Sequence, residues 1–162
     1  MTYNKEWFSS NVKLHQSGLY GLAITILKNE EDAKDAVQET LYRAFYNIDS
    51  LRDPEKFKPW IMKILANTAY EMLRNKKYQL NIDDYNDIIK DPNTLDLSIK
   101  ISLWDAVQSL KLSYRPIVIM FYYEDLSIKE ISEILSLTTV TTKKRLSRAR
   151  KQLKQILEGK EV

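Results

Sequence analysis

The chain has 162 residues, a net charge of only +3 and 44% hydrophobic side chains, a composition typical of one globular domain or two small ones. With no cysteine and three glycines it cannot form a disulfide framework, a thiolate metal site or a glycine-rich phosphate loop, and the lone His15 leaves little room for a histidine triad. No apolar run approaches the ~18 residues of a membrane span, and the N-terminus lacks the apolar core of a signal peptide, so we expect a cytoplasmic protein without metal, cofactor or catalytic site.

Residues 1–78 have the apolar period of three successive helices. The second is expected to begin in the acidic cluster after Asn29, and the third at Pro59, because proline suits the first position of a helix. Between them lies a polar segment, residues 49–58. The positions predicted to face one small core are Leu19, Leu22, Ala23, Ile26, Leu27, Ala33, Ala36, Val37, Leu41, Ala44, Phe45, Ile48, Trp60, Ile61, Ile64, Leu65, Ala69, Met72 and Leu73.

Residues 79–97 differ from both flanks. They carry five aspartates and one lysine, with no sustained period. This pattern indicates a flexible acidic linker, with a short helical turn near residues 85–89. The alternative is a long surface loop within a single domain, but a structureless loop of this length is uncommon in a compact domain. The sequence therefore predicts an all-α protein of two small domains, residues 1–78 and 98–162.

Residues 98–162 are expected to form four helices, the last two arranged as a helix-turn-helix. Ser127 and Glu130 form a capping box that opens the third of these helices. Short hydroxyl residues at 136–138 predict a turn, and the helix after it has several cations and no acid before residue 157. Such a helix, held at an angle by its neighbour, fits the DNA major groove. The alternatives are a solvated basic face or a helix that binds a protein partner. Its predicted apolar face is Leu146, Ala149, Leu153, Ile156 and Leu157.

Two stretches together carry a resemblance to a known family. The run DAKDAVQETLYRAFYNIDSLRDPEKFKPWIMKILANTAYEMLRN resembles region 2 of an extracytoplasmic-function (ECF) sigma factor of the sigma-70 family. The run LWDAVQSLKLSYRPIVIMFYYEDLSIKEISEILSLTTVTTKKRLSRARKQL is similar to region 4. Region 4 alone would be ambiguous, because response regulators carry a similar helix-turn-helix. The combination implies a non-catalytic subunit that brings RNA polymerase to promoters and helps to melt them.

The resemblance assigns a polymerase-docking role to the second helix. Its residues Asp35, Gln38, Glu39 and Arg43 are expected to bind the coiled coil of the β′ clamp of RNA polymerase core. From the residues alone, the default interpretation of this charged helix side is a solvated face. The apolar helices of region 4 are expected to seat on the β flap of the same enzyme.

The resemblance also implies two DNA sites. The segment 49–58, with Lys63, Asn67 and Arg74 on the third helix, is expected to bind the single-stranded −10 element. An asparagine amide offers donors and an acceptor to a flipped base. The basic helix is expected to read the −35 element as duplex, with its cations on phosphates and its N-terminal end near base edges. The residues assigned to the −35 element are Thr139, Thr141, Lys143, Lys144, Arg145, Arg148 and Arg150.

The chain departs from the family pattern at a few positions. Ala66 stands where the family often has an arginine beside Asn67, Ser136 replaces the frequent turn glycine, and Thr142 puts a hydroxyl at a common apolar anchor. We expect these changes to affect promoter preference. The resemblance further implies control by an anti-sigma factor, commonly anchored in the membrane. The main alternative is a helix-turn-helix regulator that acts without polymerase, and a small helical enzyme is a more distant one.

Overall fold

The computed structural model describes residues 3–79 and 102–159. All regular structure in these two ranges is helical, and neither contains a strand, which confirms the predicted all-α fold. Of the helices described, none is long and apolar enough to cross a membrane. The predicted linker lies outside the described residues, apart from Gln79 at the end of a helix, and so does the turn near 85–89.

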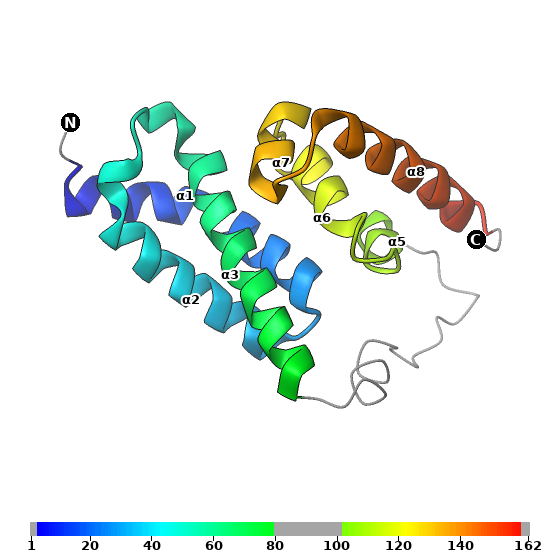
Figure 1. Ribbon diagram of the computed structural model, residues 1–162, viewed down its shortest axis with the longest axis horizontal. Coiled ribbons are helices and arrows are strands. Elements are labelled where there is room, and N and C mark those ends of the chain that lie inside the picture. Colours follow the sequence, from blue (N-terminus) through cyan, green and yellow to red (C-terminus); the bar gives the residue numbers. More distant parts are fainter. Residues whose placement is uncertain (1–2, 80–101, 160–162) are drawn as a thin grey trace.

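Three helices build the N-terminal domain: α1 (Lys5–Leu27), α2 (Glu30–Tyr46) and α3 (Phe57–Gln79). Lys28 ends α1 in the left-handed conformation, with φ at 57°. Asn29 then caps α2, because its side-chain oxygen accepts a hydrogen bond from the Asp32 backbone N–H. The helix therefore begins in the acidic cluster after Asn29, as predicted. The three helices pack against one another around one apolar core (Figure 1).

That core matches most of the predicted stripes. Positions on α1 and α3 that share one helical face are almost fully buried, so the two long helices supply most of its volume. His15 lies at the edge of this core, stacked on Phe57 with ring centroids 5.7 Å apart. Burial and the nearby Lys58 lower the pKa of His15. The almost fully buried predicted positions are Leu19, Leu22, Ala23, Ile26, Ala33, Ala36, Ala44, Ile61, Leu65 and Ala69.

The start of α3 was predicted incorrectly. A 3-10 turn, η2 (Pro54–Lys56), leads directly into the helix, which begins at Phe57 and not at Pro59. Pro54, not Pro59, is the proline that opens a helical turn. Pro59 is still tolerated in the first turn of α3, because the first four N–H groups of a helix have no partner within it.

Phe45 and Leu157 were predicted to be buried but are about half exposed. Phe45 is 48% exposed near the C-terminal end of α2, where its ring contacts the rings of Phe8 and Tyr46. Leu157 is also 48% exposed, as the last residue of its helix. Helical period alone places a residue on a face, but it does not show where the partner helix stops.

The C-terminal domain contains α5 (Leu103–Gln108), α6 (Arg115–Val118), the π-helical turn η3 (Ile119–Tyr123), α7 (Ile128–Leu135) and α8 (Thr139–Leu157). The turn η3 continues α6 without a break, so the two form the second helix expected from the sequence. α8 contacts α5, α6 and α7, which therefore hold it as one side of a small bundle (Figure 1).

The helix-turn-helix has the predicted caps. Ser127 and Glu130 form both hydrogen bonds of the capping box. Ser136, in place of a glycine, adopts a left-handed conformation with φ at 55°, and Thr138 caps α8. Thr142 is fully buried, and its hydroxyl donates to the Thr138 carbonyl at 2.9 Å. The Thr142 hydroxyl therefore has a hydrogen-bond partner within the turn, and its side chain is buried at the position that is commonly apolar in the family.

The two domains pack against each other. α3 contacts α7, and α1 contacts α6 and η3 (Figure 1). We call this the closed arrangement. It brings the helix-turn-helix of the C-terminal domain onto the face of α3 that holds Lys63, Asn67 and Arg74.

Candidate polymerase and nucleic-acid interfaces

The exposed face of α2 presents one polar stripe. Asp35, Gln38 and Glu39 are exposed and follow each other at helical spacing. Tyr42 and Tyr46 continue the stripe and are 60% and 69% exposed, with ring centroids 4.7 Å apart. We did not predict these tyrosines as site residues. The signal was available, because they lie seven and eleven residues after Asp35 on the same face.

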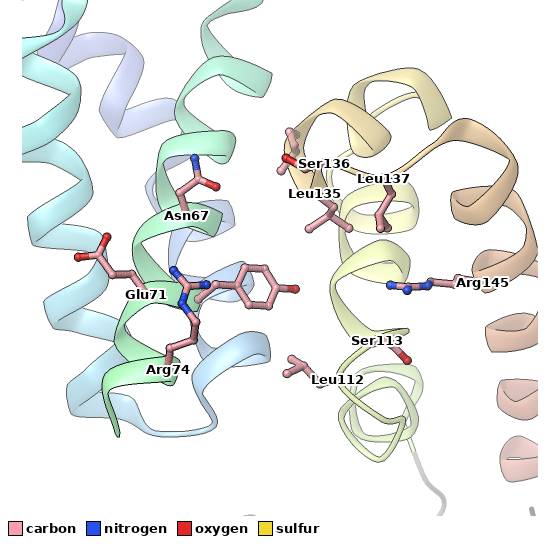
Figure 2. A pocket seen from close by; sticks show the side chains of 11 residues that line it. Asn67, Glu71, Arg74, Leu112, Ser113, Leu135, Ser136, Leu137 and Arg145 are labelled. Atoms are coloured by element: carbon pink, nitrogen blue, oxygen red, sulfur yellow. The ribbon is translucent and has the colours of Figure 1, made fainter. Parts of the chain in front are cut away.

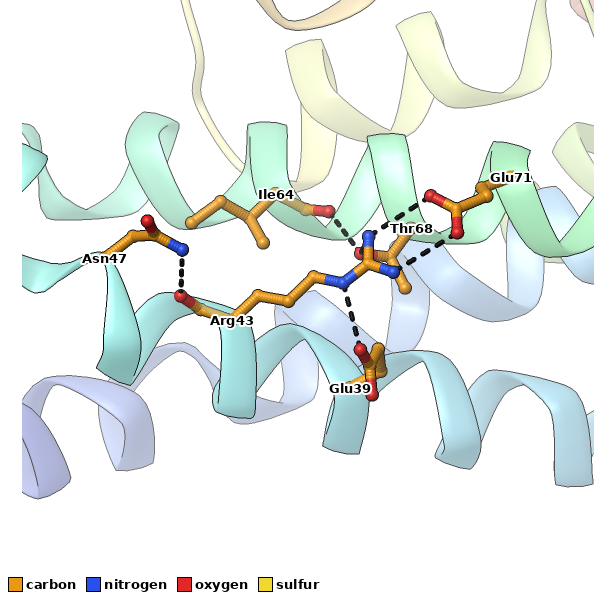
Figure 3. Close-up of polar contacts among 6 residues, drawn as sticks. All are labelled: Glu39, Arg43, Asn47, Ile64, Thr68 and Glu71. Atoms are coloured by element: carbon orange, nitrogen blue, oxygen red, sulfur yellow. Dashed lines mark hydrogen bonds and ion pairs between the residues drawn. The ribbon is translucent and has the colours of Figure 1, made fainter.

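Arg43 lies beside this stripe and links α2 to α3 (Figure 3). Its guanidinium donates to Glu39 at 3.0 Å, to Glu71 at 3.3 Å and to Thr68 at 3.2 Å. The Glu71 and Glu39 carboxylates raise the pKa of Arg43, and Arg43 in turn lowers the pKa of Glu71. Arg43 thus orients Glu39 and holds the two helices together.

The segment between α2 and α3 is built from short turns. η1 (Ile48–Ser50) is followed by η2, and Asp53 caps η2 through the Glu55 backbone N–H. The Trp60 indole N–H donates to the Ser50 hydroxyl at 3.0 Å, which fastens the first turn to α3. The segment that the resemblance assigns to the −10 element is therefore a structured, polar edge at the start of α3.

Lys63, Asn67 and Arg74 form one exposed stripe on α3, with Tyr70 between them. In the closed arrangement Asn67, Tyr70 and Arg74 line a cavity of about 510 Å³, whose other wall comes from the C-terminal domain. Figure 2 shows Asn67 and Arg74 on one side and Leu135, Ser136 and Arg145 on the other.

Tyr70 shows how closely the two domains approach. Burial raises the pKa of its phenol to about 12, although the charges of Arg115 and Arg145 act in the opposite direction. Both arginines belong to the C-terminal domain, so Tyr70 of α3 lies close enough to that domain to interact electrostatically with its charges.

The N-terminal half of α8 keeps most of its cations exposed. Thr139, Lys143, Lys144 and Arg148 are exposed, Arg145 is half-buried against the cavity of Figure 2, and Thr141 accepts a hydrogen bond from the capping Thr138. This end of the helix combines exposed cations with a helix N-terminus, which is suited to phosphate contact.

Arg150 is placed differently from the other predicted −35 residues. Its Nε donates to the Tyr122 hydroxyl, and its guanidinium lies 5.4 Å from the Phe121 ring centroid. It also borders an apolar groove of about 420 Å³, formed with Leu103, Leu153 and other residues at the C-terminal end of α8. Arg150 lies seven residues after Lys143 and eleven after Thr139 on α8, but its side chain already has partners within the C-terminal domain.

Comparisons with known proteins decide the family. The model of Sigma-70 region 2 matches residues 12–78, and the model of Sigma-70 region 4 matches residues 100–153. The chain belongs to the ECF sigma factors. It is 36% identical to the RNA polymerase sigma factor SigV of Bacillus subtilis, over 86% of this chain and 84% of that protein. It is 30% identical to the ECF sigma factor SigW of the same organism, over 95% and 90% of the two chains.

Solved structures agree with this assignment. The sigma factor superposes on RpoE from Bartonella quintana, solved with the anti-sigma factor NepR, with a TM-score of 0.75 and 25% identity over 93% of this chain and 96% of that one. CnrH, solved with the cytosolic domain of CnrY, shares the fold with a TM-score of 0.67 over 98% of this chain and 92% of that one.

The comparisons favour a sigma factor over a helix-turn-helix regulator that acts without polymerase, because region 2 is present as well as region 4. The family consists of transcription initiation factors. Among the residues that the structure describes, no group of three or more histidines and carboxylates could hold a metal ion.

Proposed function

We propose that this sigma factor binds RNA polymerase core through the α2 stripe Asp35, Gln38 and Glu39. The observation that carries the proposal is the exposure of this stripe on the helix where the family resemblance places polymerase docking. Arg43 supports the stripe from behind by fixing Glu39. The exposed Tyr42 and Tyr46 extend it, and aromatic side chains are frequent anchors in protein interfaces.

Promoter DNA is the second partner. The edge formed by residues 49–58, together with Lys63, Asn67 and Arg74, binds the single-stranded −10 element. The N-terminal half of α8 binds the −35 duplex. The apolar groove beside Arg150 suits an apolar helix or loop, and it seats region 4 on the β flap of polymerase. Arg150 then serves the flap contact more than the DNA contact.

An anti-sigma factor is the third partner. RpoE and CnrH, which share this fold, were solved in complexes with the anti-sigma factor NepR and with CnrY, respectively. We propose that a membrane-anchored anti-sigma factor holds this chain inactive in the cytoplasm. Occupation of the polymerase-binding surfaces by that partner would prevent assembly with core.

In vitro transcription is the direct test of the whole proposal. Purified chain and RNA polymerase core are incubated with a genomic fragment library, and the 5′ ends of the transcripts are mapped. We expect start sites that share a −10 and a −35 element and that vanish when either component is left out. Transcripts with the same start sites from core alone would contradict the proposal.

Duplex binding by the full chain should depend steeply on salt. If α8 neutralises about four or five phosphates, the slope of log affinity against log salt should be about −4. Lys144→Ala removes one exposed cation of α8 and should reduce the slope by about one, uniformly across DNA sequences. Fluorescence anisotropy on a labelled duplex measures both values, and Lys13→Ala on α1 serves as the charge-matched control. An unchanged slope for Lys144→Ala would exclude this lysine from the contact.

A further inference from the structure

The residues that lead into α1 lie outside the part of the chain that the region 2 family model matches. That match begins at residue 12, so neither Tyr3 nor Trp7 belongs to it. Asn4 caps α1 by accepting the Trp7 backbone N–H at 2.7 Å, and this cap fixes the direction in which the chain enters the helix. Tyr3 comes directly before the cap and is half-buried against the three-helix core.

Tyr3 is bonded to the segment between α2 and α3. Its hydroxyl donates to the Leu51 carbonyl oxygen at 2.8 Å, across 48 residues of sequence. Leu51 follows η1 and precedes η2 in extended backbone, with φ at −78° and ψ at 105°, so its carbonyl belongs to neither turn. The residue is 4% exposed, and a buried carbonyl needs a hydrogen-bond partner. The Tyr3 hydroxyl supplies that partner.

Four aromatic side chains, which we call the aromatic row, connect this hydrogen bond to the start of α3. The ring centroids of Tyr3 and Trp7 lie 4.4 Å apart, and Trp7 meets Phe57 edge to face at 5.6 Å. Phe57 and Trp60 complete the row at 5.8 Å. Such contacts are favourable beyond the area that they bury. Because the Trp60 indole donates to the Ser50 hydroxyl, the row holds two consecutive residues of the segment, one from each of its ends.

Arg52 is the residue that follows this held pair, and its side chain is exposed. It lies within residues 49–58, the segment assigned to the −10 element. Single-stranded nucleic acid binds through phosphate contacts and stacking. A cation on a backbone that is already fixed loses less conformational freedom on binding than one on a mobile loop. The hydrogen bond to Leu51 therefore prepares the backbone from which Arg52 projects.

We propose that Tyr3 and Trp7 are positioning residues for the −10 element, which hold residues 50–52 in the conformation that lets Arg52 contact a phosphate of the single strand. The inference rests on the −10 role assigned under Proposed function. It adds to that role two residues that shape the site without contacting DNA, and one cation through which they act.

Three substitutions separate this hydrogen bond from general packing. Tyr3→Phe removes only the hydroxyl that donates to Leu51. Trp7→Leu removes the ring between Tyr3 and Phe57 but keeps an apolar side chain. Tyr20→Phe is the matched control, because it removes a tyrosine hydroxyl from a half-buried ring on α1, away from the aromatic row. Far-UV circular dichroism checks that each variant is folded.

The first measurement does not depend on any DNA role. Amide hydrogen exchange of the full chain, followed by mass spectrometry, reports local opening of a segment. We expect the peptide that covers residues 48–53 to exchange about threefold faster or more in Tyr3→Phe and in Trp7→Leu, because a lost hydrogen bond favours opening by roughly this factor. Peptides of α8, and this peptide in Tyr20→Phe, should exchange at the wild-type rate. A wild-type rate in either test variant overturns the positioning role and leaves the proposed function intact.

The second measurement tests whether Tyr3 acts through Arg52. Holoenzymes are formed from core and each variant, and promoter opening is followed on a promoter mapped by the transcription experiment above. Tyr3→Phe and Arg52→Ala should each slow opening by about threefold or more, and the double variant should be no slower than Arg52→Ala alone. Core affinity and initial duplex affinity should stay within about twofold of wild type, because α2 and α8 are unchanged.

Two outcomes of the second measurement overturn the positioning role. One is an opening rate that Tyr3→Phe leaves unchanged. The other is a double variant in which the two effects multiply, since Tyr3 would then act independently of Arg52. If the wild-type chain starts no transcription with core, the proposed function fails, and this inference fails with it.

Discussion

Asp35→Ala combined with Gln38→Ala should reduce the affinity for RNA polymerase core by at least about 100-fold, which corresponds to about 2.7 kcal/mol. Both side chains are exposed on α2 and lie on the stripe that carries Glu39. Truncation of a few central interface residues commonly removes this much binding energy. The fold should be unaffected, because exposed substitutions away from caps and buried networks change stability by about 0.5 kcal/mol or less.

The matched control is Glu6→Ala combined with Gln16→Ala. These residues are also an acid and a glutamine exposed on a helix, but they lie on α1. Binding is measured by competition against a labelled sigma factor for core, and run-off transcription on a mapped promoter gives the second readout. Equal affinity of the two double variants would contradict the docking role of α2. It would also reopen the alternative of a regulator that acts without polymerase.

A third variant, Tyr42→Ala with Tyr46→Ala, extends the same experiment to the residues that we did not predict from sequence. Their rings pack on each other and stay largely in solvent. If the docking surface includes them, core affinity should fall about tenfold or more, again with little change in stability. The measurement is the same competition assay. An affinity equal to wild type would limit the surface to the polar stripe.

The sequence predicted the helices and their caps well, for local reasons. Asn29, Ser127 and Thr138 each satisfy backbone N–H groups within a few residues, so their roles do not depend on the rest of the fold. The buried stripes of α1 and α3 were also correct, because each repeats over several turns. Errors fell near helix ends. Phe45 lies near the end of α2, where less of the core remains to cover it, and Pro59 follows a 3-10 turn that already leads into α3.

The network around Arg43 shows why the sites were harder to predict. Helical spacing places Glu39 beside Arg43, but Glu71 is 28 residues away and reaches the guanidinium only once α3 packs on α2. Sequence reasoning therefore assigned Arg43 to the exposed face, whereas the structure uses it as a link between helices. Arg150 is a similar case, since its partner Tyr122 lies 28 residues away.

The contact between the domains could not be predicted from composition. The acidic residues of the C-terminal domain that pair with Lys56 and Lys58 are Glu130 and Glu124, and the capping box alone already accounted for Glu130. One carboxylate thus has two uses, with Oε1 on the Ser127 N–H and Oε2 toward Lys56. The contact between Glu130 and Lys56 forms only because the two domains pack together, which the sequence pattern does not show.

Arg115→Met should lower the free energy of unfolding of the full chain by about 3 kcal/mol. Arg115 is 6% exposed, and its guanidinium donates to the Leu110 carbonyl at 2.9 Å as well as to the Thr25 carbonyl. Methionine keeps much of the aliphatic stem, so packing changes little. Two buried carbonyls lose a charged donor, and each such bond contributes about 1.5–3 kcal/mol. Arg115→Lys should recover only part of the loss, because an ammonium cannot reproduce the fork of the guanidinium.

Urea denaturation followed by circular dichroism and tryptophan fluorescence measures the effect, with Trp104 in the C-terminal domain and the other tryptophans in the N-terminal one. Lys111→Met is the matched control, since this lysine is exposed in the same segment and its Nζ lies 4.6 Å from the Tyr114 ring centroid. It should change stability by about 0.5 kcal/mol or less. Because Arg115 bonds to both domains, its loss should also separate the two fluorescence transitions, which a purely local role within the C-terminal domain would not do. A variant as stable as the control, with coincident transitions, would remove Arg115 from the interface that holds the sigma factor closed.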